Sequence, residues 1–465
     1  MNKNKLSRRD FLALATGALA GAALSACQTG TPTEAPAEEE PGGPAEAGDE
    51  VTEVELWTGF GQGRMADAMA GAVERFNDEY EQFNVNHEII PWGDIRDKVI
   101  SSTAAGDPPD VYRGWAWIIG DDAPIGGLTD LTPFVEALPD GGSLDEFWPA
   151  TLEQMKYQGQ IYGMSISTMV QMLYYNKDRM REEGLDPDNI PTDLEGWEEA
   201  GEQLYDVADD GSIDKVGFCP LIPFQAIHSW GATRGAEVWD DATQTCIAND
   251  DTNGPIFIEL LNWYKGYAEE YGAEELQAFM TSYQGNNFGR NTPEGIYYTG
   301  LLGIWHIATW LYNDMKEYGP DVDFGVTKVP SPAGVDGKPG YLQANVYLVP
   351  TGCENPEGGF NFANFMSSSP WVAINKAGPD SVTPSREPNA QLPELEEAAP
   401  WLPMARDEIL PFAWPNPSMP SVNFYLGQLN DMVTEVVWND VDPEVALNNA
   451  VEASQLEVDQ KLEQG

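Results

Sequence analysis

The sequence predicts an α/β fold in which helices cover a parallel β-sheet on both faces. Short apolar runs bounded by glycine, proline and aspartate alternate with longer segments whose apolar residues recur at helical spacing. This alternation is typical of β-α-β units. The chain is also 42% hydrophobic and contains 15 Trp, 18 Tyr and 17 Phe, which is enough for a sizeable core and unlike a disordered acidic chain. Its 465 residues suggest two or three domains.

The amino-terminal part of the folded chain shows this alternation clearly. After a glycine-rich loop, Met69, Val73, Phe76 and Tyr80 recur on one face of a helix. A turn rich in proline at 106–110 then leads into a strand. The expected elements of this part are a strand at 54–58, a helix at 65–80, a strand at 85–90, a helix at 95–105 and a strand that begins at 111.

The rest of the chain continues in the same style, without an internal repeat of 20–50 residues. The expected strands are at 172–175, 216–219, 300–304, 324–326 and 346–350. One helix is expected to begin after residue 193. Further helices are expected at 256–271, 358–366, 423–437 and 443–462.

The first 26 residues have the pattern of an export signal. Basic residues precede a short apolar run at 11–23, which is too short to span a membrane. The pair Arg8-Arg9 resembles the twin-arginine signal, and residues 24–27, Leu-Ser-Ala-Cys, resemble a bacterial lipobox. We therefore predict that residues 1–26 are a twin-arginine signal peptide, cut before Cys27, and that the thiol of Cys27 receives the lipid.

Residues 27–50 are expected to form a flexible acidic linker behind the lipidated Cys27. The segment is rich in Pro, Gly, Ala and Glu and has no aromatic residue, so it has little apolar surface to bury. No later segment approaches 18 uninterrupted apolar residues, and no transmembrane helix is predicted. The protein is therefore expected at the extracytoplasmic face of the cell membrane, held there by its lipid anchor.

The charge of the chain narrows the choice of partners. It has 76 acidic and 24 basic residues, a formal net charge of −52. Such a chain lacks the basic surface that nucleic-acid binding requires, and it is unsuited to docking a basic surface on anionic lipid. A saline habitat is a hypothesis for the acidity, because salt screens self-repulsion between surface charges.

Metal and cofactor chemistry is not indicated. His87, His228 and His306 are scattered, without the spacing of a zinc site. The sequence has no nucleotide-binding loop and no nucleophile elbow, so we predict neither a metal nor a cofactor. An exported chain can join two of the cysteines that remain, but the spacing does not select a pair. These cysteines are Cys219, Cys246 and Cys353.

Seven short segments resemble, in the same order, the landmarks of one protein family. They are 54–57 (Val-Glu-Leu-Trp), 104–111 (Ala-Ala-Gly-Asp-Pro-Pro-Asp-Val), 159–164 (Gly-Gln-Ile-Tyr-Gly-Met), 173–178 (Leu-Tyr-Tyr-Asn-Lys-Asp), 323–326 (Asp-Phe-Gly-Val), 360–366 (Phe-Asn-Phe-Ala-Asn-Phe-Met) and 383–386 (Thr-Pro-Ser-Arg). Together they resemble the extracellular solute-binding proteins of ABC sugar importers, the family that includes maltose-binding protein. The resemblance covers about residues 51–460.

This resemblance implies a two-lobe periplasmic-binding-protein-like fold with hinge crossovers. The first lobe would comprise residues 51–165 and 345–403, and the second lobe residues 172–340 and 408–465. The crossovers would lie near 165–171, 341–345 and 401–407. In such a protein the lobes close on the ligand, so the ligand must bind the closed state more tightly than the open one.

The resemblance also implies where a sugar would bind. Aromatic rings complement the apolar faces of sugars, and planar polar groups complement their hydroxyl edges. Trp57 and Phe60 end the first strand, and Trp115 and Trp117 follow the third. Other candidates match hinge or second-lobe positions of the family: Phe224, Trp230, Trp305, Trp310, Asn345, Trp414, Phe424 and Tyr425. The resemblance leaves Trp305 and Trp310 as alternatives, and for every Trp the competing interpretation is a place in the core.

Two classes of function follow from these features. The first is a receptor without enzymatic activity, which carries a mono- or oligosaccharide or a polyol to an ABC importer. Its implied partners are the sugar, the permease subunits and their ATPase, and the receptor itself is expected to be a monomer. The second is an exported glycoside hydrolase or another carbohydrate-active enzyme. The family landmarks favour the receptor; glycerol phosphate or a polyamine-like cation is an alternative ligand, and the acidic charge disfavours anions.

Overall fold

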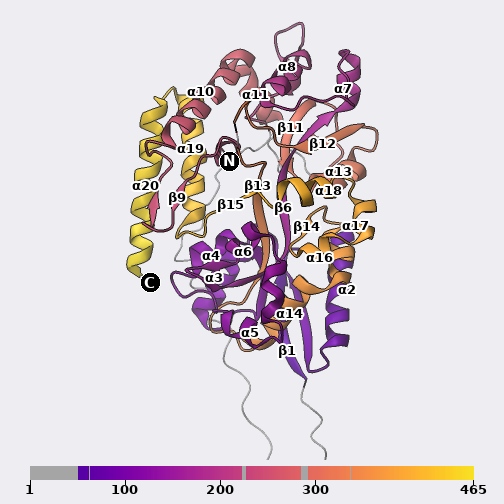
Figure 1. Ribbon diagram of the computed structural model, residues 1–465, viewed down its shortest axis with the longest axis vertical. Coiled ribbons are helices and arrows are strands. Elements are labelled where there is room, and N and C mark those ends of the chain that lie inside the picture. Colours follow the sequence, from indigo (N-terminus) through magenta and orange to yellow (C-terminus); the bar gives the residue numbers. More distant parts are fainter. Residues whose placement is uncertain (1–50, 62, 223–226, 284–291, 336, 465) are drawn as a thin grey trace, which may run out of the picture. The chain divides into compact units, whose positions relative to one another are not determined.

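The computed structural model describes residues 51–61, 63–222, 227–283, 292–335 and 337–464 (Figure 1). The predicted signal peptide, Cys27, the acidic linker and Phe224 lie outside the described residues. The described residues form one compact unit. None of the helices within them is long and apolar enough to cross a membrane.

An eleven-stranded sheet runs through the described chain in the order β2-β1-β3-β13-β6-β11-β8-β7, with three further strands at its sides. Its strands are β1 (Thr52–Thr58), β2 (Phe83–Ile89), β3 (Val111–Trp115), β6 (Gly163–Asn176), β7 (Asp206–Val207), β8 (Ile213–Phe218), β11 (Leu302–Ala308), β12 (Phe324–Lys328), β13 (Tyr341–Leu348), β14 (Thr383–Pro384) and β15 (Trp414–Pro415). Two small hairpins pair β4 (Lys156–Tyr157) with β5 (Gln160–Ile161) and β9 (Trp239–Asp240) with β10 (Thr245–Cys246).

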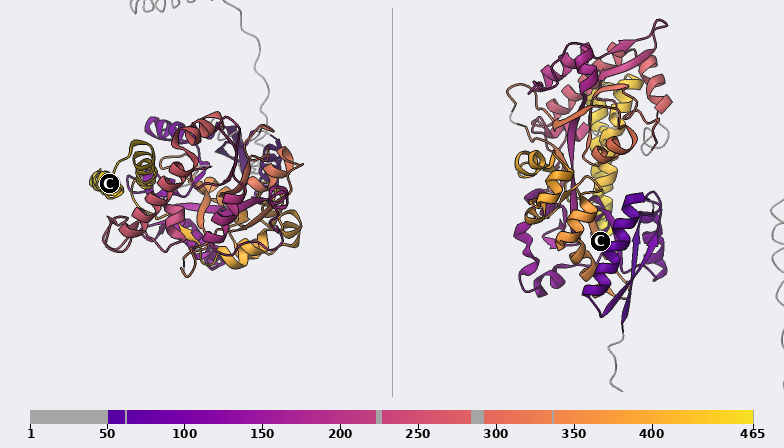
Figure 2. Two further views of the ribbon diagram at one scale, coloured as in Figure 1. Left: turned by 90° about the horizontal axis from the view of Figure 1, so that it is seen from above. Right: turned by 90° about the vertical axis from the view of Figure 1, so that its right-hand side faces the viewer.

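Helices pack around this sheet, and Figure 2 shows the carboxy-terminal pair α19 and α20, in yellow, from two further sides. The longer helices are α2 (Gly63–Glu79), α3 (Ile95–Ala105), α8 (Leu194–Gln203), α10 (Gly254–Tyr271), α11 (Ala273–Tyr283), α13 (Leu311–Tyr318), α14 (Pro356–Ser368), α19 (Val422–Asn439) and α20 (Pro443–Gln464). The shorter ones are α4 (Trp117–Asp122), α5 (Thr132–Ala137), α6 (Pro149–Gln154), α7 (Lys177–Glu182), α9 (Ile227–Ala232), α15 (Pro370–Val372), α16 (Glu387–Ala390), α17 (Pro393–Ala398), α18 (Leu402–Met404) and the turns η1 (Gly141–Glu146), η2 (Ala373–Ala377) and η3 (Ala405–Ile409).

Each expected strand and helix overlaps an observed one, because the local patterns that predicted them are those that the core buries. In β1, Leu56 and Trp57 are buried in two different clusters, since successive side chains of a strand point to opposite faces of the sheet. Helix α3 ends where Gly106 adopts a left-handed conformation with φ 79°. Asp110 is structural: its carboxylate accepts hydrogen bonds from the backbone N–H groups of Glu55 and Asn355.

The expected parallel sheet describes only part of the observed one. Strands β2, β1 and β3 are parallel to one another, and β11 is parallel to β8. Strand β13 is antiparallel to β3, and β6 is antiparallel to both β13 and β11. Local periodicity does not encode strand direction, so the two strands that join the parallel groups could not be distinguished from the others.

Strand β6 belongs to both parts of the sheet. Its residues up to Val170 pair with β13, whereas its residues from Gln171 onward pair with β11 and β12. The expected crossovers at 165–171 and 341–345 therefore lie within β6 and β13, and 401–407 covers α18 and the start of η3. Extended chain with backbone pairing on both sides thus connects the predicted first and second lobes.

Three hydrophobic clusters accompany this sheet. Two of them lie on opposite faces of the first-lobe strands, and the third fills the second lobe and extends to the segment at 390–422. All three cysteines in the described chain are free; Cys219 and Cys246 are buried, and Cys353 is half-buried. Burial raises the pKa of each thiol to about 12, so the thiols are protonated at neutral pH.

Candidate ligand-binding site

The parallel strands β1, β2 and β3 end at the same edge of the sheet, where ligands of α/β sheets characteristically bind. Each of these ends carries an aromatic residue. Phe60 follows β1, Trp92 follows β2 and Trp115 ends β3, while Trp117 opens α4. The sheet therefore gathers four aromatic side chains from separate parts of the chain.

These four rings form a continuous series, which we call the aromatic row. The ring centroids of Phe60 and Trp92 are 4.8 Å apart, and those of Trp92 and Trp115 are 5.7 Å apart. Trp115 and Trp117 are stacked at 5.9 Å with an interplanar angle of 7°. Phe60 is buried, whereas the three Trp side chains are half-buried and can still accept a contact on part of their surface.

Two buried cations adjoin the aromatic row. The Arg113 guanidinium carbon lies 5.5 Å from the Trp92 ring and 5.9 Å from the Trp115 ring. The Nζ atom of Lys376, on η2, lies 4.2 Å from the Phe60 ring. Arg113 is 4% exposed and Lys376 is 1% exposed. Burial lowers the pKa of Arg113 to about 10; burial, together with repulsion from Arg113, lowers that of Lys376 to about 8.

Asn345 on β13 provides an unused hydrogen-bonding group next to the aromatic row. It pairs in register with Trp115 of β3 and with Ser167 of β6. Its side-chain Nδ2 donates to Ser167 Oγ at 3.1 Å, but its buried Oδ1 has no partner. Because an unpaired buried polar atom is unfavourable, this oxygen is suited to accept a hydrogen bond from a ligand or a water molecule.

A group of aromatic and polar side chains, which we call the polar cluster, lies at the start of β13 and consists of His228, Tyr341, Trp414 and Asn416. The rings of His228, Tyr341 and Trp414 contact one another, with centroids 5.1 to 6.0 Å apart. Both ring nitrogens of His228 and the Oδ1 atom of Asn416 are buried without a partner. Burial lowers the pKa of His228 to about 3, which keeps the imidazole neutral at physiological pH. Tyr341 and Asn345 are four positions apart along β13, about 13 Å in extended chain.

Trp57 is near the aromatic row but has structural contacts of its own. Its Nε1 donates to Glu55 Oε1 at 2.7 Å, and Lys98 Nζ lies 3.9 Å from its ring. The side chain is 4% exposed and packs in the cluster beneath α3. The structure therefore places Trp57 beside the site, on the face of β1 that is occupied by core.

The second-lobe candidates occupy different environments. Trp230 and Trp305 are fully buried in the second-lobe cluster, where Trp305 stacks on Tyr174 at 5.8 Å. Tyr425 is 0% exposed, and its hydroxyl already donates to the carbonyl of Val238. Trp310, at the start of α13, is half-buried, and Phe424 on α19 is exposed. Of the two alternatives Trp305 and Trp310, Trp310 is the more accessible.

Side-chain contacts between the predicted lobes lie near Lys376. Arg64, at the start of α2, forms an ion pair of 2.8 Å with Asp314 on α13 and a second ion pair with Glu317. Asn313 donates from Nδ2 to the carbonyl of Gly378, two residues beyond Lys376. The bridge between α2 and α13 therefore lies beside the turn that carries the buried lysine.

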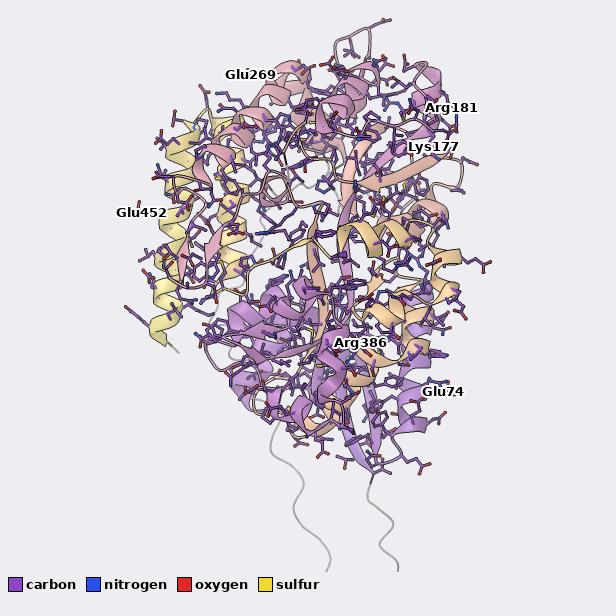
Figure 3. The ribbon with its side chains drawn as sticks, viewed as in Figure 1. Glu74, Lys177, Arg181, Glu269, Arg386 and Glu452 are labelled. Atoms are coloured by element: carbon purple, nitrogen blue, oxygen red, sulfur yellow. The ribbon has the colours of Figure 1, made fainter. Side chains whose placement is uncertain are left out.

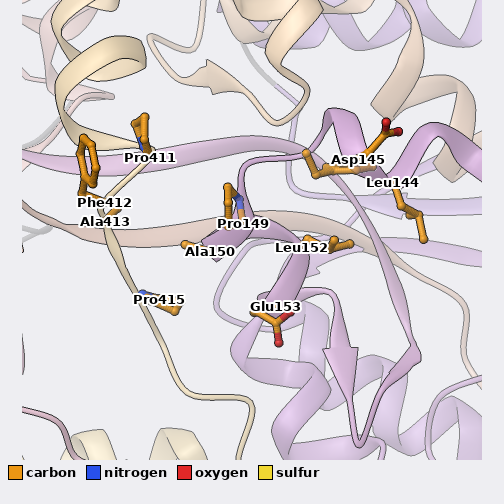
Figure 4. Close-up of a pocket in the computed structure, with 11 residues that line it drawn as sticks. Leu144, Asp145, Pro149, Ala150, Leu152, Glu153, Pro411, Phe412, Ala413 and Pro415 are labelled. Carbon is orange, nitrogen blue, oxygen red and sulfur yellow. The ribbon is translucent and has the colours of Figure 1, made fainter.

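Two open pockets lie elsewhere. The first, of about 470 Å³, is formed by the segment 144–153 and the segment 411–415 (Figure 4). The second, of about 510 Å³, is lined by residues from Met180 to Gln203. Neither is lined by the aromatic row or the polar cluster, so we place the candidate site on the strand ends, where the unused polar groups lie.

Sequence reasoning missed four residues of this site: Trp92, Arg113, His228 and Lys376. Trp92 could have been found, because it follows the second strand as Phe60 follows the first. An arginine inside an otherwise apolar strand, as at Arg113, was a further signal. Nothing local distinguishes Lys376, which only the fold brings to Phe60.

Comparison with known proteins agrees with this architecture. The family described as bacterial extracellular solute-binding protein matches residues 62–373. A putative binding protein of Brucella abortus is 24% identical over 64% of this chain and 68% of its own length. The arabinooligosaccharide-binding protein of Bacillus subtilis is 24% identical over 62% of each chain.

Solved structures resemble the fold over most of the chain. A mannobiose-bound protein called CpMnBP1 is 21% identical, with a TM-score of 0.70 over 87% of this chain and 100% of its own. An ABC substrate-binding protein of Listeria monocytogenes in complex with cycloalternan is also 21% identical, with a TM-score of 0.70 over 88% and 99%. The maltose-bound MalE3 of T. maritima has a TM-score of 0.68 at 19% identity, over 87% and 100%. At 19 to 21% identity, the structural likeness to these proteins establishes the two-lobe α/β fold.

Proposed function

Because this chain belongs to the family of bacterial extracellular solute-binding proteins, we propose that it binds a carbohydrate between its two lobes for uptake by an ABC importer. The aromatic row carries this proposal. The half-buried rings of Trp92, Trp115 and Trp117, at the ends of β2 and β3 and at the start of α4, are suited to the apolar faces of sugar rings. The relatives named above with bound sugars or a sugar in their name support the same class of ligand.

Buried polar atoms without a hydrogen-bond partner complete the proposed site. A saccharide presents many hydroxyl groups, and each can donate to an acceptor such as Asn345 Oδ1 or Asn416 Oδ1. Both atoms are buried without a partner. A ligand hydroxyl that donates to either atom therefore forms a hydrogen bond that the free protein lacks, and this favours binding. The proposed contacts are those of the aromatic row with Asn345, Trp414, Asn416 and His228. We propose that Trp310, which is half-buried, joins them from the second lobe.

A thermal-unfolding screen tests this function. The protein is heated with neutral oligosaccharides, acidic oligosaccharides, polyols, glycerol phosphate and polyamines. A ligand that binds only the folded state raises the unfolding temperature. We expect a saccharide to do so; stabilisation only by polyamines or by glycerol phosphate would contradict the carbohydrate assignment.

We further propose that the protein is a receptor and has no hydrolytic activity. Incubation of each stabilising oligosaccharide with the protein, followed by chromatography of the products, checks this. The oligosaccharide is expected to be recovered intact, and cleavage products that appear in proportion to the amount of protein would instead support the glycoside hydrolase alternative.

The proposed partners are the permease subunits and the ATPase of an ABC importer, and the proposed anchor is a lipid on Cys27. Growth of the native host on the stabilising saccharide measures delivery of that saccharide to the importer. A Cys27→Ala variant expressed in the native host should leave the membrane fraction for the medium, with unchanged saccharide affinity. Retention of this variant in the membrane fraction would contradict lipid anchoring at Cys27.

A further inference from the structure

Two buried cations at the proposed sugar site share one carboxylate. Arg113 donates to the carbonyl of Gly114, while its buried Nε atom has no partner. Asp380 attracts both Arg113 and Lys376, but its Oδ2 atom stands 3.9 Å from Lys376 Nζ, beyond hydrogen-bonding distance. One positive charge of this pair therefore lacks a compensating carboxylate.

The aromatic rings do not supply the missing compensation. The free energy that a cation gains over an aromatic ring is smaller than the penalty for removing the ion from water. Two other buried arginines, Arg179 and Arg386, are well partnered. Arg179 donates to the carbonyls of Val216 and Leu301, and Arg386 pairs with Glu146 at 3.1 Å. Arg113 differs from both, and it lies at the strand ends where the ligand is proposed to bind.

We propose that the saccharide carried by this protein bears a carboxylate, and that Arg113 and Lys376 receive it beside the aromatic row. This rests on the proposed function, because it assumes that the row is the platform for the sugar. The guanidinium fork matches a planar carboxylate, and the ammonium adds a point charge. One uncompensated positive charge balances a carboxylate, whereas a phosphate carries about −1.5 to −2 at neutral pH.

The acidity of the whole chain does not oppose this ligand. The net charge of −52 is spread over a large surface, and salt screens exposed charges beyond a Debye length of about 8 Å at physiological ionic strength. Buried charges are screened much less, so the pair at the strand ends dominates the potential that a bound ligand meets. The expectation that anions are disfavoured rests on the overall charge and the small number of arginines, and a local pair of buried cations is an exception to it.

The test compares two sets of probes on the same protein. The acidic set contains oligosaccharides from hydrolysed pectin, alginate and glucuronoxylan, and the neutral set contains those from mannan, arabinan and starch. We expect the acidic set to raise the unfolding temperature. If only the neutral set does so, the carboxylate is wrong and the proposed function stands; if neither set does so, the proposed function fails as well.

Variants then assign the binding to the two cations. Arg113→Gln and Lys376→Gln should each weaken binding of the stabilising acidic oligosaccharide by roughly 10- to 100-fold. The matched control is Lys98→Gln, because Lys98 also lies over a tryptophan but is only half-buried and is paired with Glu88. Equal affinity in Arg113→Gln and in the parent protein would overturn the proposal.

A measurement without ligand separates this role from a structural one. If Arg113 is retained for a ligand, Arg113→Met should leave the unfolding temperature of the free protein unchanged or raise it. Arg179→Met is the control; it should lower the temperature, because it removes a buried donor from carbonyls that it satisfies. An equal loss of stability in both variants would make Arg113 a structural residue and overturn the proposal.

Discussion

Trp115 shows how much of the proposed site depends on single side chains. It contacts Trp92 on one side and Trp117 on the other, so it connects Trp117 to the rest of the aromatic row. Its backbone pairs with Asn345, whose Oδ1 atom is unpartnered. One residue therefore links the apolar and the polar parts of the site.

Truncation of this ring should reduce affinity with little effect on the fold. Trp115→Ala is expected to weaken saccharide binding by about 1–3 kcal/mol, roughly 5- to 150-fold in Kd. Calorimetric titration measures this. The control is Trp371→Ala, since Trp371 is another half-buried first-lobe tryptophan and packs against Gly71 of α2. Similar losses of affinity in both variants would argue against the aromatic row as the sugar platform.

His228 gives the protein a predictable response to acid. Its folded-state pKa of about 3 is below the usual 6.5, because burial disfavours the imidazolium. The unfolded chain therefore binds a proton that the folded chain excludes as the pH falls from about 6.5 toward 3, and stability is lost in this window. For one histidine the slope is about 1.4 kcal/mol per pH unit.

Urea unfolding of the parent protein and of His228→Phe, measured between pH 7 and pH 4, checks this contribution. Below about pH 6 the variant should lose stability more slowly than the parent, by about 1.4 kcal/mol per pH unit. The imidazole contacts the rings of Tyr341 and Trp414, and phenylalanine can preserve these contacts. Parallel stability curves would show that His228 is not held neutral by burial.

At the level of the elements, the two long strands and the bridge between α2 and α13 are the features that relate the lobes. Strands β6 and β13 are continuous through both parts of the sheet. Arg64 on α2 joins Asp314 and Glu317 on α13, and its Nε donates to the carbonyl of Pro379. A hinge through the strands with a side-chain bridge beside the site is suited to a closed state that ligand binding favours.

Removal of this bridge should favour lobe opening. Arg64→Ala is expected to increase the radius of gyration of the free protein in solution scattering and to weaken saccharide binding by roughly 1–2 kcal/mol. The control is Arg75→Ala on the same helix, whose pair with Glu79 is exposed and lies within α2. An unchanged radius and unchanged affinity in Arg64→Ala would mean that the bridge does not contribute to closure.

For the molecule as a whole, the dominant property is its negative charge. The formal net charge is −52, and acidic side chains such as Glu74, Glu269 and Glu452 project from the outer helices (Figure 3). Like charges at this density repel one another, which destabilises a compact chain unless ions screen them. The saline-habitat hypothesis follows from this argument.

Stability should therefore rise with salt. We expect the unfolding temperature to increase by several degrees between ~0.05 M and ~2 M NaCl, with most of the gain below about 0.5 M, because the Debye length falls to about 3 Å by 1 M. Scanning calorimetry over this series measures the effect. Equal stability at both ends would remove the reason for the hypothesis, and a gain confined to the highest salt would indicate salting-out instead of screening.

The amino-acid sequence by itself determined the family and the order of strands and helices. Hydrophobic periodicity and turn residues are local, and each predicted element overlaps an observed one. The landmark resemblance to solute-binding proteins is confirmed by the family match over residues 62–373. The predicted lobe boundaries and the lipid anchor stay predictions.

Only the tertiary structure decided which side chains meet. Trp92, Arg113 and Lys376 are far apart in the chain, and pairing of β1 with β2 and β3 and the position of η2 bring them to Phe60. The same packing places Trp230, Trp305 and Tyr425 in the core, although their sequence context equally suited a binding surface. Whether an aromatic or charged side chain faces a ligand or a core depends on strand pairing between distant segments, which local periodicity does not encode.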